Sequence, residues 1–265
     1  MASRVSVILV LAVVFVSGCT TLTSTRKSFR LGETAIYARV KQHGEPSPTM
    51  VNVHDDENTS VRAGSVVIRE SGGRLVELAH DGNRLITFKL QGETYRFDPN
   101  RIFTEDGIHS TLTRQGNYSE AAQAAVRNFA SQFIETFALS REPVIIALHN
   151  TGKGGLSISS YEPNRELNLA AAGVHKSKSR SPGDFFYVTD ERLFQWLKAR
   201  DFNVMLQDNA NVPDDGSMSV YFARKGIPYL NIEANVNHLT EQIEMVRAAR
   251  QMLIELGLSP APPPP

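Results

Sequence analysis

A histidine and a glutamate three residues apart, His54 and Glu57, directly follow a short apolar run in the segment VNVHDDENTS, residues 51–60. Imidazole nitrogens and carboxylate oxygens both bind zinc, and two histidines with one glutamate and a water molecule form a known catalytic zinc set. The H-x-x-E pattern also occurs at His238 and Glu241. No expected strand precedes that second copy, so we interpret it as the polar first turn of the last helix.

A third candidate ligand, His149, ends the apolar run PVIIALH. A lone histidine at a strand end is more often structural, but this one could converge with His54 and Glu57 from a neighbouring strand. Between the two motifs lies the pair Asn100 and Arg101, in YRFDPNRIF. A guanidinium offers a planar fork of donors for a carboxylate or a polarised carbonyl, so the pair is a candidate for substrate binding. We add Asn150, the residue after His149, as a further candidate for substrate binding.

Short apolar or β-branched runs alternate with helix-like stretches along the chain. This alternation predicts one α/β domain with a mixed, mostly parallel central sheet flanked by helices, and ligands bind beyond the carboxyl ends of such strands. The expected strands are Thr49 to Val53, Arg74 to Leu78, Arg84 to Leu90, Pro143 to His149, Asp184 to Thr189, Asn203 to Gln207 and Ile227 to Glu233. The expected helices are Asn58 to Glu70, Ser119 to Leu139, Asp190 to Arg200, Ser217 to Lys225 and Leu239 to Leu256.

The order of three motifs, H-x-x-E, then D-x-N-R-x-F, then L-H-N-T, resembles the zinc carboxypeptidase superfamily. The nearest resemblance is to its aspartoacylase and succinylglutamate desuccinylase branch. The resemblance implies a zinc ion and the fold of that superfamily. It places the zinc ligands at His54, Glu57 and His149, and the substrate-holding pair at Asn100 and Arg101.

The segment DDGSMSVYFARKGIPYLNIEAN, residues 214–235, resembles the carboxypeptidase segment that ends in the catalytic glutamate. That position is Glu233, which the resemblance makes the general base. Arg101 would bind a carbonyl oxygen or a substrate carboxylate. Tyr221 lies near the place of a catalytic tyrosine, although core packing is the favoured interpretation. The chain departs from the family pattern at Asp55 and Asp56, where glycine and asparagine are usual, and at Pro99.

The first residues predict export. Arg4 is followed by an apolar run, residues 5–16, which is shorter than a membrane span and typical of a signal peptide. The run ends in VSGC, which resembles a bacterial lipobox and predicts lipid attachment to Cys19, the only cysteine. Thr20 follows it, which in a Gram-negative host favours the outer membrane. The expected parts are a signal peptide over residues 1–18, a flexible tether over 19–28, the hydrolase-like domain over 29–258 and a proline-rich tail over 259–265.

Lysine plus arginine equals aspartate plus glutamate, at 28 each, which argues against a nucleic acid partner. The resemblance, together with the predicted export, implies a zinc-dependent amide hydrolase held at the membrane of the cell envelope by a lipid anchor. A carboxypeptidase or amidase acting on peptidoglycan peptides is the first hypothesis. The alternatives are a deacylase of small N-acyl amino acids and a binding lipoprotein that has lost turnover. Glu233 separates the enzymes from the last class, because a degenerate member would often lose this base.

Overall fold

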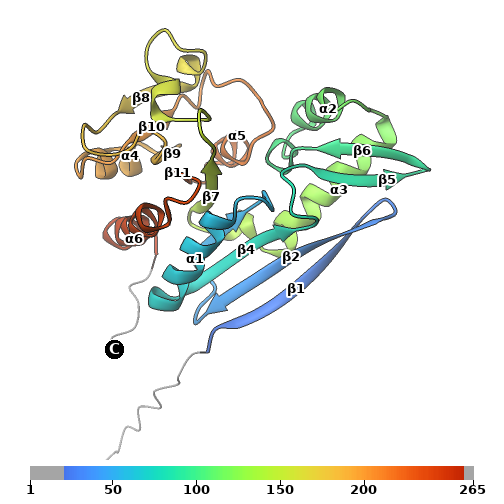
Figure 1. The fold of residues 1–265 in the computed structure, drawn as a ribbon, viewed down its shortest axis with the longest axis horizontal. Helices are drawn as coiled ribbons and strands as arrows, with labels where there is room; N and C mark the ends of the chain where they lie inside the picture. Colours follow the sequence, from blue (N-terminus) through green and yellow to red (C-terminus); the bar gives the residue numbers. More distant parts are fainter. Residues whose placement is uncertain (1–20, 260–265) are drawn as a thin grey trace, which may run out of the picture.

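The computed structural model describes residues 21–259, which form a nine-stranded sheet in the order β1-β2-β4-β3-β7-β11-β9-β10-β8 and a separate hairpin, β5-β6 (Figure 1). The strands are β1 (Thr23–Leu31), β2 (Thr34–His43), β3 (Thr49–Asn52), β4 (Gly73–Ala79), β5 (Ile86–Leu90), β6 (Glu93–Phe97), β7 (Ile145–Thr151), β8 (Ala171–His175), β9 (Phe185–Val188), β10 (Val204–Gln207) and β11 (Tyr229–Asn235). The helices are α1 (Asn58–Ser71), α2 (Glu105–Arg114), α3 (Glu120–Thr136), α4 (Glu191–Lys198), α5 (Met218–Arg224) and α6 (Leu239–Glu255).

The centre of the sheet is parallel, with β4, β3, β7 and β11 side by side. Antiparallel pairs flank this centre, β1-β2-β4 on one side and β11-β9 on the other. Every residue of β7 is buried, as expected for a strand covered on both faces. The fold class expected from the sequence, a single α/β domain with a mixed sheet, is confirmed.

Helices cover both faces of the sheet, because successive side chains of a strand point to opposite sides. Met50 of β3 packs in the cluster with residues of α1, α4 and α6. Its neighbour Val51 packs in the other cluster, with residues of α2, α3, α5 and the β5-β6 hairpin. The two layers fix the sheet from both sides and leave the carboxyl ends of the parallel strands free to build a site.

Side-chain caps start most of the helices. In four helices the residue before the first turn accepts a hydrogen bond from a backbone N–H of that turn. These residues are Thr104 for α2, Ser119 for α3, Asp190 for α4 and Ser217 for α5. At the start of α1 the residue in this position is Glu57, and its side chain makes no capping bond. The carboxylate of Glu57 is thus available for contacts outside the helix.

The expected flexible tether over residues 19–28 is wrong from Thr23 onward, since β1 begins there and pairs with β2 along its whole length. Only Phe29 and Leu31 of β1 are buried. A mostly polar edge strand carries little hydrophobic periodicity, which is why the sequence did not predict it. Cys19, the expected signal peptide and most of the proline-rich tail lie outside the described residues.

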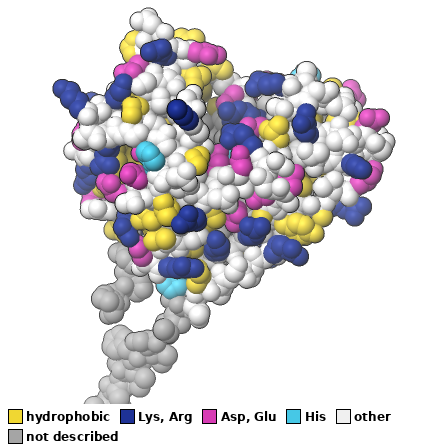
Figure 2. All heavy atoms as spheres, viewed as in Figure 1, with side chains coloured by type: hydrophobic (Ala, Val, Ile, Leu, Met, Phe, Trp, Pro, Cys, Tyr) yellow, Lys and Arg dark blue, Asp and Glu magenta, His cyan; other side chains and the backbone are white. Residues whose placement is uncertain are grey.

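Within residues 21–259, no helix has the length and apolar character needed to span a membrane. On the face shown in Figure 2, basic and acidic side chains are interspersed.

Candidate metal centre and its pocket

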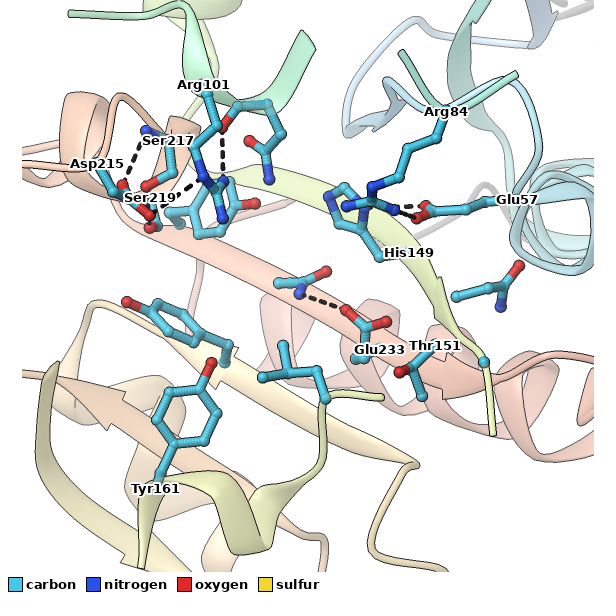
Figure 3. Close-up of a pocket in the computed structure, with 17 residues that line it drawn as sticks. Glu57, Arg84, Arg101, His149, Thr151, Tyr161, Asp215, Ser217, Ser219 and Glu233 are labelled. Carbon is cyan, nitrogen blue, oxygen red and sulfur yellow. Dashed lines mark hydrogen bonds and ion pairs between the residues drawn. The ribbon is translucent and has the colours of Figure 1, made fainter. Parts of the chain in front are cut away.

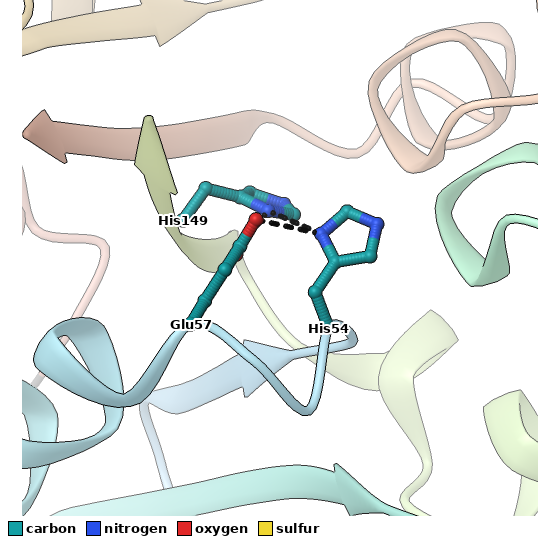
Figure 4. A group of neighbouring side chains, drawn as sticks. All are labelled: His54, Glu57 and His149. Atoms are coloured by element: carbon teal, nitrogen blue, oxygen red, sulfur yellow. Dashed lines mark hydrogen bonds and ion pairs between the residues drawn. The ribbon is translucent and has the colours of Figure 1, made fainter. Parts of the chain in front are cut away.

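His54, Glu57 and His149 bring three potential ligand groups together in the interior (Figure 4). Nδ1 of His54 lies 2.9 Å from Glu57 Oε1, and Nδ1 of His149 lies 2.9 Å from Glu57 Oε2. The two Nδ1 atoms are 3.2 Å apart. All three side chains are at most 5% exposed. The two histidines and the acid that the sequence singled out therefore do converge.

The parallel pairing of β3 and β7 explains the convergence. Met50 and Val51 lie beside Ile146 and Ala147, so the two strands end at the same edge of the sheet. The carboxamide of Asn52 donates to Leu148 O and to the hydroxyl of Ser60, and thereby ties β3 to β7 and to α1. His54 comes from the turn after β3, Glu57 from the start of α1, and His149 from β7 itself.

Two further charged residues hold this triad from outside. His54 Nε2 lies 2.8 Å from Asp98 Oδ1, and Arg84 Nη1 donates to Glu57 Oε1 over 2.8 Å. A carboxylate behind a ligating histidine is the usual partner that fixes the ring orientation in metal sites. Asp98 takes this position and leaves Nδ1 of His54 to face the other two ligands.

Buried charges perturb the titration of these groups. Burial alone would lower the pKa of His54, but Glu57 and Asp98 outweigh it and raise that pKa to about 9. Burial would raise the pKa of Glu57, but His149 and His54 hold it well below its usual range. Burial would likewise raise the pKa of Asp98, but His54, Arg84 and Arg101 hold it below its usual range. Without a metal ion, the centre is a carboxylate pair around a protonated His54.

The residues present fit a zinc ion. Two imidazole nitrogens and one carboxylate, with ligand atoms within 4.8 Å of one another, are the donor set of catalytic His₂Glu zinc sites. Glu57 and His149 also line a cavity of about 340 Å³, which leaves room for a water molecule or a substrate beside them. A structural zinc site would instead be closed by a fourth protein ligand.

Glu233 lies in the same cavity, at the carboxyl end of β11 (Figure 3). It stands beside His149 in the parallel register of β11 and β7. Its side chain makes one hydrogen bond, in which Asn231 donates to Oε2 over 3.2 Å. Burial raises the pKa of Glu233 to about 7, so its carboxyl group can exchange a proton near neutral pH.

The far end of the cavity carries Arg101 and Asp215, with Nε and Oδ2 3.5 Å apart (Figure 3). Two glycines bring these residues together. Gly216 has a φ of +76°, and a Cβ on it would lie 2.6 Å from Arg101 O and 2.5 Å from the Cα of Gly107. No larger residue fits this approach, so the backbone of Gly216 fixes Asp215 next to Arg101. Asn100, the other member of the expected pair, lines the cavity too.

The expected role of Asn150 in substrate binding does not fit its contacts. Its carboxamide accepts from Ser60 N and donates to Gln242 Oε1 and Ala234 O. Both donor hydrogens and the oxygen are thus used to join β7, β11, α1 and α6. Asn150 lines the cavity, but both of its donor hydrogens are used within the fold, so it has no free donor for a ligand.

The second H-x-x-E copy lies away from the centre, as expected. His238 precedes α6 and contacts Asp184, with Nδ1 2.8 Å from Oδ2. Tyr221 packs its ring against Phe103 and Phe222, in line with the core-packing interpretation.

Three charged residues of the site were not singled out from the sequence as functional: Arg84, Asp98 and Asp215. Asp98 had a signal, because it opens the D-x-N-R-x-F motif. Asp215 lies at the start of the segment of residues 214–235 that resembles the carboxypeptidase segment, whereas Arg84 had no signal, since it reaches the cavity from a loop and no periodicity marks it.

The fold and these side chains define an α/β protein with a candidate His–Glu–His metal centre beside a buried glutamate. No protein-family model and no curated protein sequence matches the chain. A presumed metallopeptidase from Shewanella amazonensis is similar over 90% of this chain and 88% of that chain, with a TM-score of 0.43 and 14% identity. An aspartoacylase family protein from Mesorhizobium loti is similar over 92% and 69% of the two chains, with a TM-score of 0.42 and 13% identity.

The cell shape determinant protein Csd4 from Helicobacter pylori, in a structure with bound tripeptide, is similar over 90% of this chain and 56% of that chain, with a TM-score of 0.41 and 10% identity. At these TM-scores and identities the likeness supports no conclusion about activity, so we infer function from the side chains alone.

Proposed function

We propose that the protein is a zinc-dependent amide hydrolase of the carboxypeptidase or amidase type. The observation that carries the proposal is the convergence of His54, Glu57 and His149 beside a buried glutamate, Glu233, whose pKa is raised to about 7. A zinc ion held by these residues would lower the pKa of a water molecule toward roughly 7 and would polarise a carbonyl oxygen. A metal analysis of the purified protein, with and without chelator, followed by an amide hydrolysis assay, tests it directly.

Each charged residue of the site has a separate role in the proposed reaction. Glu233 accepts a proton from the attacking water and returns it to the leaving amine, because its pKa near neutrality suits both directions. Asp98 holds the ring of His54, and Arg84 holds the carboxylate of Glu57. Arg101, partly exposed at the far end of the cavity, binds a carboxylate or the oxygen on which charge develops.

The charged far end of the cavity favours small, charged amides as substrates. Peptides with a free carboxylate, including the stem peptides of peptidoglycan, and small N-acyl amino acids both offer an amide with a carboxylate within reach of Arg101. A non-catalytic binding protein is the alternative class, and the presence of Glu233 beside a complete ligand set argues against it.

Arg101→Lys is expected to impair hydrolysis although the charge is kept, since an ammonium cannot reproduce the two-pronged contact of a guanidinium. If Arg101 binds a substrate carboxylate, the main effect is a rise in KM. If it stabilises the developing oxyanion, the main effect is a fall in kcat. Steady-state kinetics on one peptide series separate the two. Arg224→Lys is the matched control, because Arg224 pairs with Asp214 on the surface. Unchanged kinetics in the Arg101 variant would remove this residue from the site.

We also propose that the protein is lipid-anchored in the cell envelope through Cys19. The support is the apolar run followed by VSGC at the start of the chain. Cys19→Ala is expected to abolish fatty acid incorporation and to leave the precursor uncleaved, because the thiol is the attachment atom. Metabolic labelling with a radioactive fatty acid measures this. Wild-type labelling of the variant would contradict the anchor.

A further inference from the structure

Asp55 and Asp56 separate the first two candidate metal ligands, and the structure gives them different surroundings. Asp56 is exposed, whereas Asp55 is half-buried. Oδ2 of Asp55 accepts hydrogen bonds from the backbone N–H groups of His80 and Gly82, each over 2.7 Å. These amides open the loop between β4 and β5, which turns at Gly82 with a φ of +78°. One carboxylate therefore fixes the start of this loop.

The same loop carries Arg84, whose side chain returns to the candidate metal centre. Arg84 Nη1 lies 2.8 Å from Glu57 Oε1, and its Nε lies 3.7 Å from Asp98 Oδ2. The side chain of Arg84 is 47% exposed, and the backbone of the loop brings it to these two acids. The contacts form a closed ring. Asp55, in the turn between His54 and Glu57, binds the start of the loop, and Arg84 of the same loop binds Glu57.

A second group of potential metal ligands consists of Asp55, His80 and Asp81. Its hydrogen bonds are those of a turn. Both bonds to Asp55 Oδ2 come from backbone amides. Asp81 Oδ1 accepts from the backbone N–H of Asn83 and contacts His80 Nδ1. These contacts explain why the three side chains lie close together. The loop also contacts the first candidate metal centre, through Arg84.

We propose that Asp55 is a positioning residue for the metal centre. Asp55 fixes the loop through the backbone amides of His80 and Gly82, and the loop places Arg84 against two acids. These are Glu57, the acidic candidate ligand, and Asp98, which contacts His54. The inference rests on the metal site of the proposed function and is independent of amide hydrolysis. Outer partners of metal ligands typically contribute 10- to 100-fold to metal affinity or activity.

Zinc affinity, measured by competition with a chromogenic chelator, tests the proposal. Asp55→Ala is expected to weaken zinc binding by about 10- to 100-fold. Asp55→Asn is expected to bind as the wild type does, because an amide oxygen can accept the same two hydrogen bonds. Asp56→Ala is the matched control: it removes the same charge from the neighbouring, exposed position. Arg84→Ala is expected to match Asp55→Ala, and the double variant is expected to lose no more than either single one.

A second readout requires no metal. In the metal-free protein, Asp55→Ala is expected to speed amide exchange at His80 and Gly82 and to shift the ring nitrogen resonances of His54, which report its contacts with Glu57 and Asp98. If Asp55 has only a local role in the loop, its replacement will change amide exchange at His80 and Gly82 but will not shift the His54 resonances. That result would overturn the proposal. Wild-type zinc affinity in Asp55→Ala, or fully additive losses in the double variant, would overturn it as well. A wild-type protein that binds zinc without hydrolysing amides would contradict the proposed hydrolysis and leave this inference standing.

Discussion

Glu233→Gln is expected to reduce kcat by about 10² to 10⁴-fold while zinc content and thermal stability stay close to the wild type. General base catalysis contributes a factor of this size, and glutamine keeps the shape of the side chain without accepting the proton. Glu233 is buried beside His149 and is not among the three converging ligands, so its replacement leaves the donor set intact. Stopped-flow or steady-state kinetics on an amide substrate, with metal analysis of the same sample, provide the measurement.

The pH profile adds an independent signature of the same residue. Glu233 must be deprotonated to accept a proton, so kcat/KM is expected to fall as the pH drops below its pKa. Burial sets that pKa at about 7 in the metal-free chain, and the positive charge of a bound zinc ion would lower it. The acidic limb of the profile should disappear in Glu233→Gln.

Glu241→Gln is the control for both measurements, because Glu241 is the exposed acid of the second H-x-x-E copy. A Glu233→Gln protein that hydrolyses amides at the wild-type rate would refute the proposed base. Loss of zinc in that variant would make Glu233 a ligand and reopen the role of Glu57.

His149→Ala is expected to bring zinc content to near zero and to abolish hydrolysis, and His54→Ala is expected to do the same. Each removes one of three buried ligand groups, and two remaining ligands do not hold a catalytic zinc ion. Elemental analysis after dialysis against a weak chelator measures the loss. His238→Ala, in the second H-x-x-E copy, is expected to keep its zinc. Stoichiometric zinc in a folded His54→Ala, His149→Ala double variant would place the metal elsewhere.

Zinc affinity of the wild type is expected to fall as the pH falls below 9. Burial lowers the pKa of His54, but Glu57 and Asp98 raise it to about 9, so at neutral pH the metal-free centre carries a proton that zinc must displace. Calorimetric titration in buffers of different ionisation enthalpy would count the protons released. No proton release at pH 7 would contradict a protonated His54 in the metal-free centre.

The sequence by itself located the central strands, and the resemblance of its motifs to a known family singled out the triad. β3, β7 and β11 are runs of apolar residues that end in polar ones, so the pattern located both the strands and the edge where His54, His149 and Glu233 emerge. The spacing of His54 and Glu57 already placed both residues in one turn. Local patterns of this kind are readable because burial and periodicity act on neighbours in the chain.

Only the tertiary structure decided which polar residues face the cavity and which are used within the fold. Asn150 follows the candidate ligand His149 and lines the cavity, yet Ser60, Gln242 and Ala234 occupy its carboxamide. Arg84 reaches Glu57 from a loop 27 positions further along the chain. Such contacts depend on strand register, on the approach of Gly216 to Gly107 and on hydrogen bonds such as those of Asp55. Each joins residues remote in sequence, so no local pattern encodes it.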